Sequence, residues 1–170
     1  GQGDAGNVDI IADDSINLVR SAIFSITDGQ SDAGLVSLDA GRQIRLTDNS
    51  SISTAVNRDV SDAFNIEPIG NGSDIVINGQ SLELVGGSQL QALSLGTAIP
   101  NSLDELGNPL NGNSGNINID VSEVVNISGT RSGILTLSGS ANGGSGGDIG
   151  INAPLGLSVD DGAVLSTQTF

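Results

Sequence analysis

Residues 115–127 read GNINIDVSEVVNI, and this stretch decides the fold. Ile117 and Ile119 alternate with polar residues, and the alternation resumes at Val125 and Ile127 after a polar turn. A period of two places successive side chains on opposite faces of a β-strand. The stretch therefore predicts two short strands, each with one apolar face.

Four other segments of the chain share this pattern. When the first residue of each segment is counted as zero, apolar residues stand at offsets two and four and again near ten and twelve. A third alternating piece follows every copy, as in AIFSIT (22–27) and GILTLS (133–138). The other segments are GNVDIIADDSINL from residue 6, GLVSLDAGRQIRL from 34, SDIVINGQSLEL from 73 and GDIGINAPLGLSV from 147.

Three short strands cannot bury an apolar face alone, but stacked copies of the same three strands can. We therefore expect an all-β fold, a parallel β-helix (β-solenoid) of about five three-stranded rungs, and treat residues 1–170 as one solenoid domain. An antiparallel sandwich or barrel also uses many short strands with Gly-rich turns. The solenoid is favoured because the second and third strands keep a fixed offset from the first.

The repeats differ in length at one place, after the third strand. The two longest additions are residues 57–72 and 96–114. Insertions at a single corner project from one side of a solenoid. These two loops are the segments that we expect to make any contact with a partner.

Composition excludes several kinds of function. The chain has no His and no Cys, which removes zinc sites of the usual kind, Ser-His-Asp triads and Cys-His pairs. Its net charge of −15, with only five basic residues, opposes binding to nucleic acid or to anionic membranes. No apolar run is long enough for a transmembrane helix. We expect no membrane insertion, no cofactor and no metal.

The stretch GGSGGDIGI (143–151) approaches a calcium-binding nonapeptide repeat, G-G-x-G-x-D-x-U-x, in which U is a large apolar residue. Position U falls on Gly150, one residue away from Ile149 and Ile151. A shift of one residue turns a strand side chain to the other face. We read the stretch as a structural corner, and keep a calcium-stiffened solenoid centred on Asp148 as an alternative.

Two adjacent acid pairs, Asp13-Asp14 and Asp160-Asp161, raise a glycan-active enzyme as a second alternative. Neighbours on a strand point to opposite faces, so both pairs are read as turn residues. Phe24 is expected to pack on the third strand or against a loop, and Phe64 is the better candidate for a contact. Only Thr167 and Thr169 resemble the Thr-x-Thr pattern of an ice-binding face. We assign no catalytic, cofactor-binding or metal residue.

The units SGNINIDVSEVVNISG (114–129) and GGDIGINAPLGLSVDDGAVLST (146–167) resemble the repeats of filamentous haemagglutinin-like two-partner secretion exoproteins. The resemblance implies a right-handed parallel β-helix from the stem of a long secreted fibre, of which this chain would be a fragment. It implies export through an outer-membrane transporter partner and an extracellular, cell-surface location. The expected function is a structural or adhesive stem segment without catalysis. Its expected partners are neighbouring rungs of the same longer chain and host or bacterial surface proteins or glycans.

Overall fold

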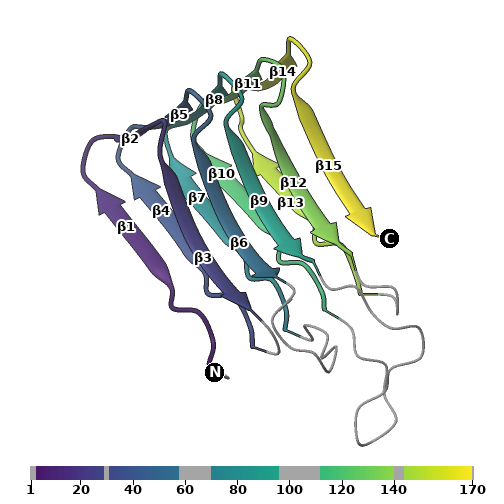
Figure 1. Ribbon diagram of the computed structural model, residues 1–170. Helices are drawn as coiled ribbons and strands as arrows, with labels where there is room; N and C mark the ends of the chain where they lie inside the picture. Colours follow the sequence, from purple (N-terminus) through teal and green to yellow (C-terminus); the bar gives the residue numbers. More distant parts are fainter. Residues whose placement is uncertain (1–2, 29–30, 58–69, 96–111, 140–143, 170) are drawn as a thin grey trace, which may run out of the picture.

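The computed structural model describes residues 3–28, 31–57, 70–95, 112–139 and 144–169. These residues form fifteen β-strands and no helix, so the expected all-β class is confirmed. The strands lie in three parallel sheets of five (Figure 1). Within the described residues, no helix is long and apolar enough to span a membrane.

Each sheet collects one strand from every repeat, in chain order. Sheet A holds the first strands: β1 (Val8–Ala12), β4 (Val36–Ala40), β7 (Ile75–Gly79), β10 (Ile117–Val121) and β13 (Ile149–Asn152). Sheet B holds the second: β2 (Ile16–Val19), β5 (Gln43–Thr47), β8 (Ser81–Val85), β11 (Val124–Ser128) and β14 (Gly156–Asp160). Sheet C holds the third: β3 (Ala22–Asp28), β6 (Ser51–Asn57), β9 (Gln89–Ser94), β12 (Gly133–Ser138) and β15 (Val164–Thr169).

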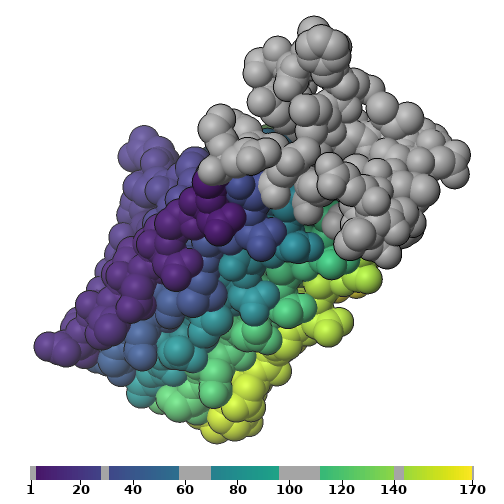
Figure 2. Space-filling model, turned by 90° about the horizontal axis from the view of Figure 1, so that it is seen from below, coloured from purple at the N-terminus to yellow at the C-terminus, as the bar shows by residue number. Residues whose placement is uncertain are grey.

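Three consecutive strands make one rung, and five rungs stack along the solenoid axis. Figure 2 shows the same order as bands that run from the N-terminal purple to the C-terminal yellow. Each strand hydrogen-bonds to its equivalent in the next rung, about 4.8 Å away. The parallel β-helix of five three-stranded rungs is therefore confirmed, and the antiparallel alternative is wrong.

The register places like residues on like residues, because the repeats align without a shift inside the strands. In sheet A one inward column is Val8, Val36, Ile75, Ile117 and Ile149. In sheet B the matching column is Ile16, Ile44, Leu82, Val125 and Leu157. The apolar pairs predicted from the sequence are the residues that line the interior.

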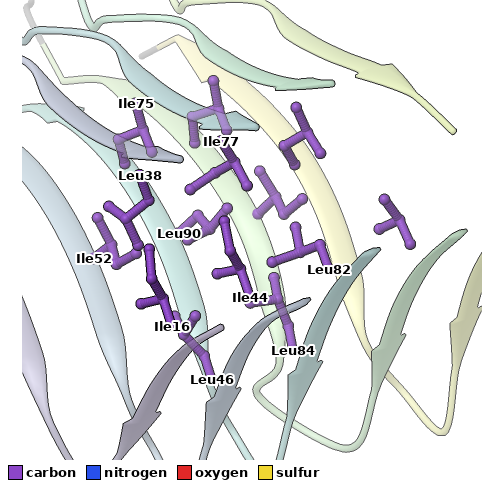
Figure 3. Close-up of a cluster of buried hydrophobic side chains, with 14 of the residues drawn as sticks. Ile16, Leu38, Ile44, Leu46, Ile52, Ile75, Ile77, Leu82, Leu84 and Leu90 are labelled. Carbon is purple, nitrogen blue, oxygen red and sulfur yellow. The ribbon is translucent and has the colours of Figure 1, made fainter. Parts of the chain in front are cut away.

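The core is a continuous aliphatic stack between the three sheets (Figure 3). Leu38, Ile44, Ile77 and Leu84 are completely buried, as are their equivalents in the other middle rungs. Burial of one such side chain contributes about 1.5–3 kcal/mol. Leu157 in the fifth rung is 47% exposed, because no described rung covers it on the outer side.

The corner between sheets B and C turns through residues in the left-handed region. Arg20, Asp48, Asn49, Arg131 and Asp161 all have positive φ there, between 48° and 72°. Gly86, Gly87, Gly129 and Gly162 share this conformation at the same corner. Each rung therefore turns sharply from its second strand into its third.

The extra residues of the repeats fall after the strands of sheet C, as expected. Residues 29–30, 58–69, 96–111 and 140–143 lie outside the described part of the chain. Most of the two long loops, residues 57–72 and 96–114, lies there too.

Candidate functional site

The described part of the GGSGGDIGI stretch, residues 144–151, leads from the fourth rung into β13. Ile149 and Ile151 pack against the core, and Gly150 occupies the outward position between them, as the register argument requires. The Oγ1 of Thr136 donates to the carbonyl of Gly147 at 2.6 Å, and the N–H of Gly147 donates to Ser114 Oγ at 2.5 Å. Side chains of the fourth rung therefore bond both backbone groups of Gly147.

Close stacking explains the glycine at this corner. A Cβ on Gly147 would lie 1.9 Å from the carbonyl oxygen of Gly115, one rung below. Gly34 and Gly115 are restricted in the same way by carbonyls of the preceding rungs. Gly6 begins the first rung and has nothing within 4 Å of its Cβ position, while the third rung carries Ser73. The glycines at this corner of the second, fourth and fifth rungs therefore allow the rungs to stack at their normal spacing.

Asn and Asp side chains bond the rungs together at the same corner. In each case a side-chain Oδ1 accepts the backbone N–H of the equivalent residue in the next rung. One column joins Asp4 to Asp32 (3.1 Å), Asp32 to Asn71 (2.7 Å), Asn71 to Asn113 (3.2 Å) and Asn113 to Ser145 (2.8 Å). A second joins Asn7 to Leu35 (2.9 Å), Asp74 to Asn116 (2.7 Å) and Asn116 to Asp148 (2.9 Å).

These oxygens do not converge on a point where a cation could sit. Asp74 and Asp148 occupy the same column but lie two rungs apart, about 10 Å at the usual strand spacing, with Asn116 between them. Calcium requires six to eight oxygen ligands around one centre. Among the described residues, no three acidic side chains gather closely enough to hold a metal ion.

The acid pair Asp13-Asp14 lies between β1 and β2, as expected for turn residues. The carboxylate of Asp14 accepts from Arg42 Nη1 at 3.0 Å, and both side chains are largely exposed. Exposed ion pairs contribute about 0–1 kcal/mol. Asp14 therefore makes a weak surface contact with the second rung.

The second pair differs from expectation in one detail, because Asp160 is the last residue of β14 and only Asp161 lies in the turn. Asp161 accepts from Ser128 Oγ at 3.0 Å, and Asp160 accepts from Ser158 Oγ. The two pairs stand four rungs apart, about 19 Å along the axis. Glycosidase carboxylates are separated by about 5–9.5 Å, so the two pairs cannot act together.

The aromatic and threonine candidates occupy different environments. Phe24 does not pack in the interior: it projects from the outer face of β3 and is 55% exposed. Phe64 lies outside the described residues. Thr167 follows Thr136 in an inward column, and Thr169 accepts from the N–H of Gly146 at 2.9 Å through its Oγ1. Thr169 therefore helps to hold the corner that leads into β13.

Buried hydroxyls on sheet C were not recognised from the sequence. Ser25 Oγ donates to the carbonyl of Gly6 at 2.8 Å, and Thr54 Oγ1 donates to the carbonyl of Ser73. With Thr136 they form one inward column, interrupted by Ala92. Each hydroxyl fixes the corner where a rung begins. The available signal was a Ser or Thr at an apolar position of the third strand, in register from repeat to repeat.

A shallow hollow lined by both polar and apolar residues lies on the outer face of sheet A, over β7, β10 and β13. Its volume is about 350 Å³, and Asn78, Asn118, Asp120 and Asn152 line it around Gly150. Asn152 Nδ2 donates to Asp120 Oδ1 at 2.9 Å. Asp120 is the one carboxylate among the lining residues, so the hollow lacks the pair that glycoside chemistry needs.

Comparisons of the chain with protein-family models, with curated proteins and with solved structures find no match.

Proposed function

We propose that this chain is a structural segment of a β-helical stem, without catalysis, in a secreted bacterial surface protein. The observation that carries the proposal is the continuity of the columns: each interior position meets its own equivalent in the next rung. The inward hydroxyls and the corner Asn and Asp side chains bond neighbouring rungs in the same way.

This arrangement suits a rod that transmits position and load. Every rung adds about 4.8 Å along one axis, and stability is shared between each rung and its neighbours. Backbone hydrogen bonds between rungs run along the axis in all three sheets. The rod is therefore held together by many parallel bonds at each step.

The open face of the fifth rung supports neighbouring rungs of a longer chain as partners. Leu157, Val159 and Leu165 are 47%, 38% and 38% exposed. Their equivalents in the fourth rung, Val125, Ile127 and Ile134, are completely buried. A hollow of about 440 Å³ opens between Ile149, Ile151, Leu157 and Leu165. A further rung with aliphatic residues in these columns would fill it.

The surface location and the adhesive role are the less direct parts of the proposal. Resemblance to secreted stem repeats supports export through an outer-membrane transporter, and a Cys-free chain is compatible with folding outside the cell. Host or bacterial surface proteins or glycans would meet the corner insertions, residues 57–72 and 96–114. Antibodies against the solenoid should then label intact cells of the source bacterium, and labelling only after permeabilisation would contradict the location.

Duplication of one rung tests the stem function. A second copy of residues 115–146, inserted between Gly146 and Gly147, should give a folded chain with one more rung and an unchanged or higher Tm. Loss of cooperative unfolding would contradict a modular rod. In parallel, release of new sugar ends from a panel of acidic and neutral polysaccharides should stay at background, and turnover that Asp120→Asn abolishes would instead support the enzyme alternative.

A further inference from the structure

Three adjacent outward columns of sheet C carry no charge, and Asp28, the last residue of β3, lies beyond them. Fifteen outward positions form three columns across the five strands, and none is Asp, Glu, Lys or Arg. The columns are Ala22, Ser51, Gln89, Gly133, Val164; then Phe24, Ser53, Gln91, Leu135, Ser166; then Ile26, Ala55, Leu93, Leu137, Gln168.

The other two sheets do not share this property. Asp9, Asp39 and Asp120 stand on the outer face of sheet A. Arg45, Glu83 and Asp160 stand on sheet B, and Arg45 pairs with Glu83 at 2.5 Å. In a chain of net charge −15, fifteen neighbouring outward positions without a charge need a reason.

Part of these columns is apolar and exposed, whereas Ser53 and Ala55 on β6 are only 3% exposed. Phe24, Ile26 and Val164 are 55%, 39% and 50% exposed. Leu93, Leu135 and Leu137 are half-buried beside them, and Ile26, Ala55, Leu93 and Leu137 follow one another in a single column. Contiguous apolar patches of this kind mark interaction surfaces. The straight register of sheet C makes the patch a regular, ribbed plane on which a second sheet can pack about 10 Å away.

We infer that the outer face of sheet C binds a second copy of this chain, sheet against sheet. A like-charged copy can approach closely only where neither partner carries charge, and this contact leaves the charged faces of sheets A and B in water. The inference does not depend on the proposed stem function.

The area of the sheet C face sets the expected strength of the dimer. Five strands about 4.8 Å apart and three columns about 6.7 Å apart span at most roughly 450 Å² per copy, or about 900 Å² for the pair, because Ser53 and Ala55 are already buried. Stable interfaces usually bury more than about 1,200 Å², and weak, reversible contacts bury less. We therefore expect a dimer that dissociates on dilution and that salt strengthens by screening the remaining repulsion.

Sedimentation equilibrium over a wide concentration range tests the inference. The 17.0 kDa chain should show a rising average mass with concentration, and more so at higher salt. Leu135→Asp should weaken association at least tenfold. Ile11→Asp, an equal change at a 74% exposed residue on the outer face of sheet A, should leave it unchanged beyond a small charge effect. Leu157→Asp, at the open fifth rung, should also leave it unchanged.

Cross-linking provides a second readout that does not depend on placing a charge in the sheet C face. The chain has no cysteine, so Gln91→Cys on the central strand β9 gives a single probe at the middle of the face. A short bismaleimide should join two Gln91→Cys copies and should not join Asn126→Cys copies, whose probe lies on the outer face of sheet B. A mass that stays monomeric up to on the order of 1 mM would overturn the inference. Association lost in Leu157→Asp but retained in Leu135→Asp would do so as well, because it would place the contact at the end of the rod.

Discussion

The Oδ1 of Asn116 accepts the backbone N–H of Asp148 at 2.9 Å, although 32 residues separate them in the chain. Asp74 bonds Asn116 in the same way one rung earlier. An apparent metal-binding motif around Asp148 is thus the upper end of a ladder in which each side chain caps the residue above it. The direction of this ladder predicts which of its members matter for stability.

Asn116→Ala should destabilise the protein more than Asp148→Ala. The first change leaves the N–H of Asp148 without its cap, at a cost of about 1 kcal/mol, whereas the exposed Asp148 side chain caps no N–H in the described residues. Thermal unfolding should show a Tm lower by about 2–4 °C for Asn116→Ala and nearly unchanged for Asp148→Ala.

Calcium addition distinguishes between a structural ladder and a metal site at Asp148. If Asp148 is only a ladder member, millimolar calcium should leave the Tm of the native protein unchanged. A rise of several degrees that disappears in Asp148→Ala would support the calcium-stiffened solenoid instead.

Gly147→Ala should be strongly destabilising, and Gly6→Ala should be neutral. The new methyl group would overlap the carbonyl oxygen of Gly115 at 1.9 Å, and that atom belongs to a backbone that cannot shift without separating two rungs. We expect a loss of at least about 2 kcal/mol in the free energy of unfolding for Gly147→Ala. Urea unfolding measures both variants, and equal stability would show that rung spacing does not require this glycine.

Thr136→Val tests the buried hydroxyl column. The change preserves the shape of the side chain but leaves the carbonyl of Gly147 without its 2.6 Å donor, at a cost of about 1–3 kcal/mol. Thr167→Val is the matched control, since Thr167 occupies the same column in the fifth rung and is exposed. If the two variants melt at the same temperature, the hydroxyl does not fix the corner.

Leu82→Ala should cost much more than Leu157→Ala. Both residues stand in one column of sheet B, but Leu82 is completely buried and Leu157 is 47% exposed. We expect a loss of about 2.5–5 kcal/mol for Leu82→Ala. Leu157→Ala should lose less than about 1.5 kcal/mol, because half of its side chain already contacts water. Chemical denaturation of the two variants in parallel measures the difference.

The sequence predicted the strands and their inward faces because period-two alternation reports directly which side chains leave water. Val8, Ile75 and Ile117 could be placed in one column from their offsets alone, and the structure pairs them in that register through β4. The repeat also favoured a solenoid over a sandwich, since stacking preserves the same offset through five copies, and the parallel sheets confirm that choice.

The sequence alone did not reveal the direction of polar side chains. Three hydroxyl side chains occupy inward positions where an apolar residue was expected: Ser25, Thr54 and Thr136. Their contribution to stability comes from hydrogen bonds to carbonyls that only the folded stack brings within reach. Phe24 was expected to pack on the third strand or to face a loop, and alternation along β3 places it on the outer face, 55% exposed.

What the sequence by itself determined is therefore the rung, its faces and its order in the stack, because these follow from local periodicity repeated along the chain. What only the tertiary structure decided is how the rungs are bonded to one another and which outward columns, lying side by side, lack charge. Both depend on atoms from different rungs that meet across about 4.8 Å of stacking, and no spacing within a single repeat records that meeting.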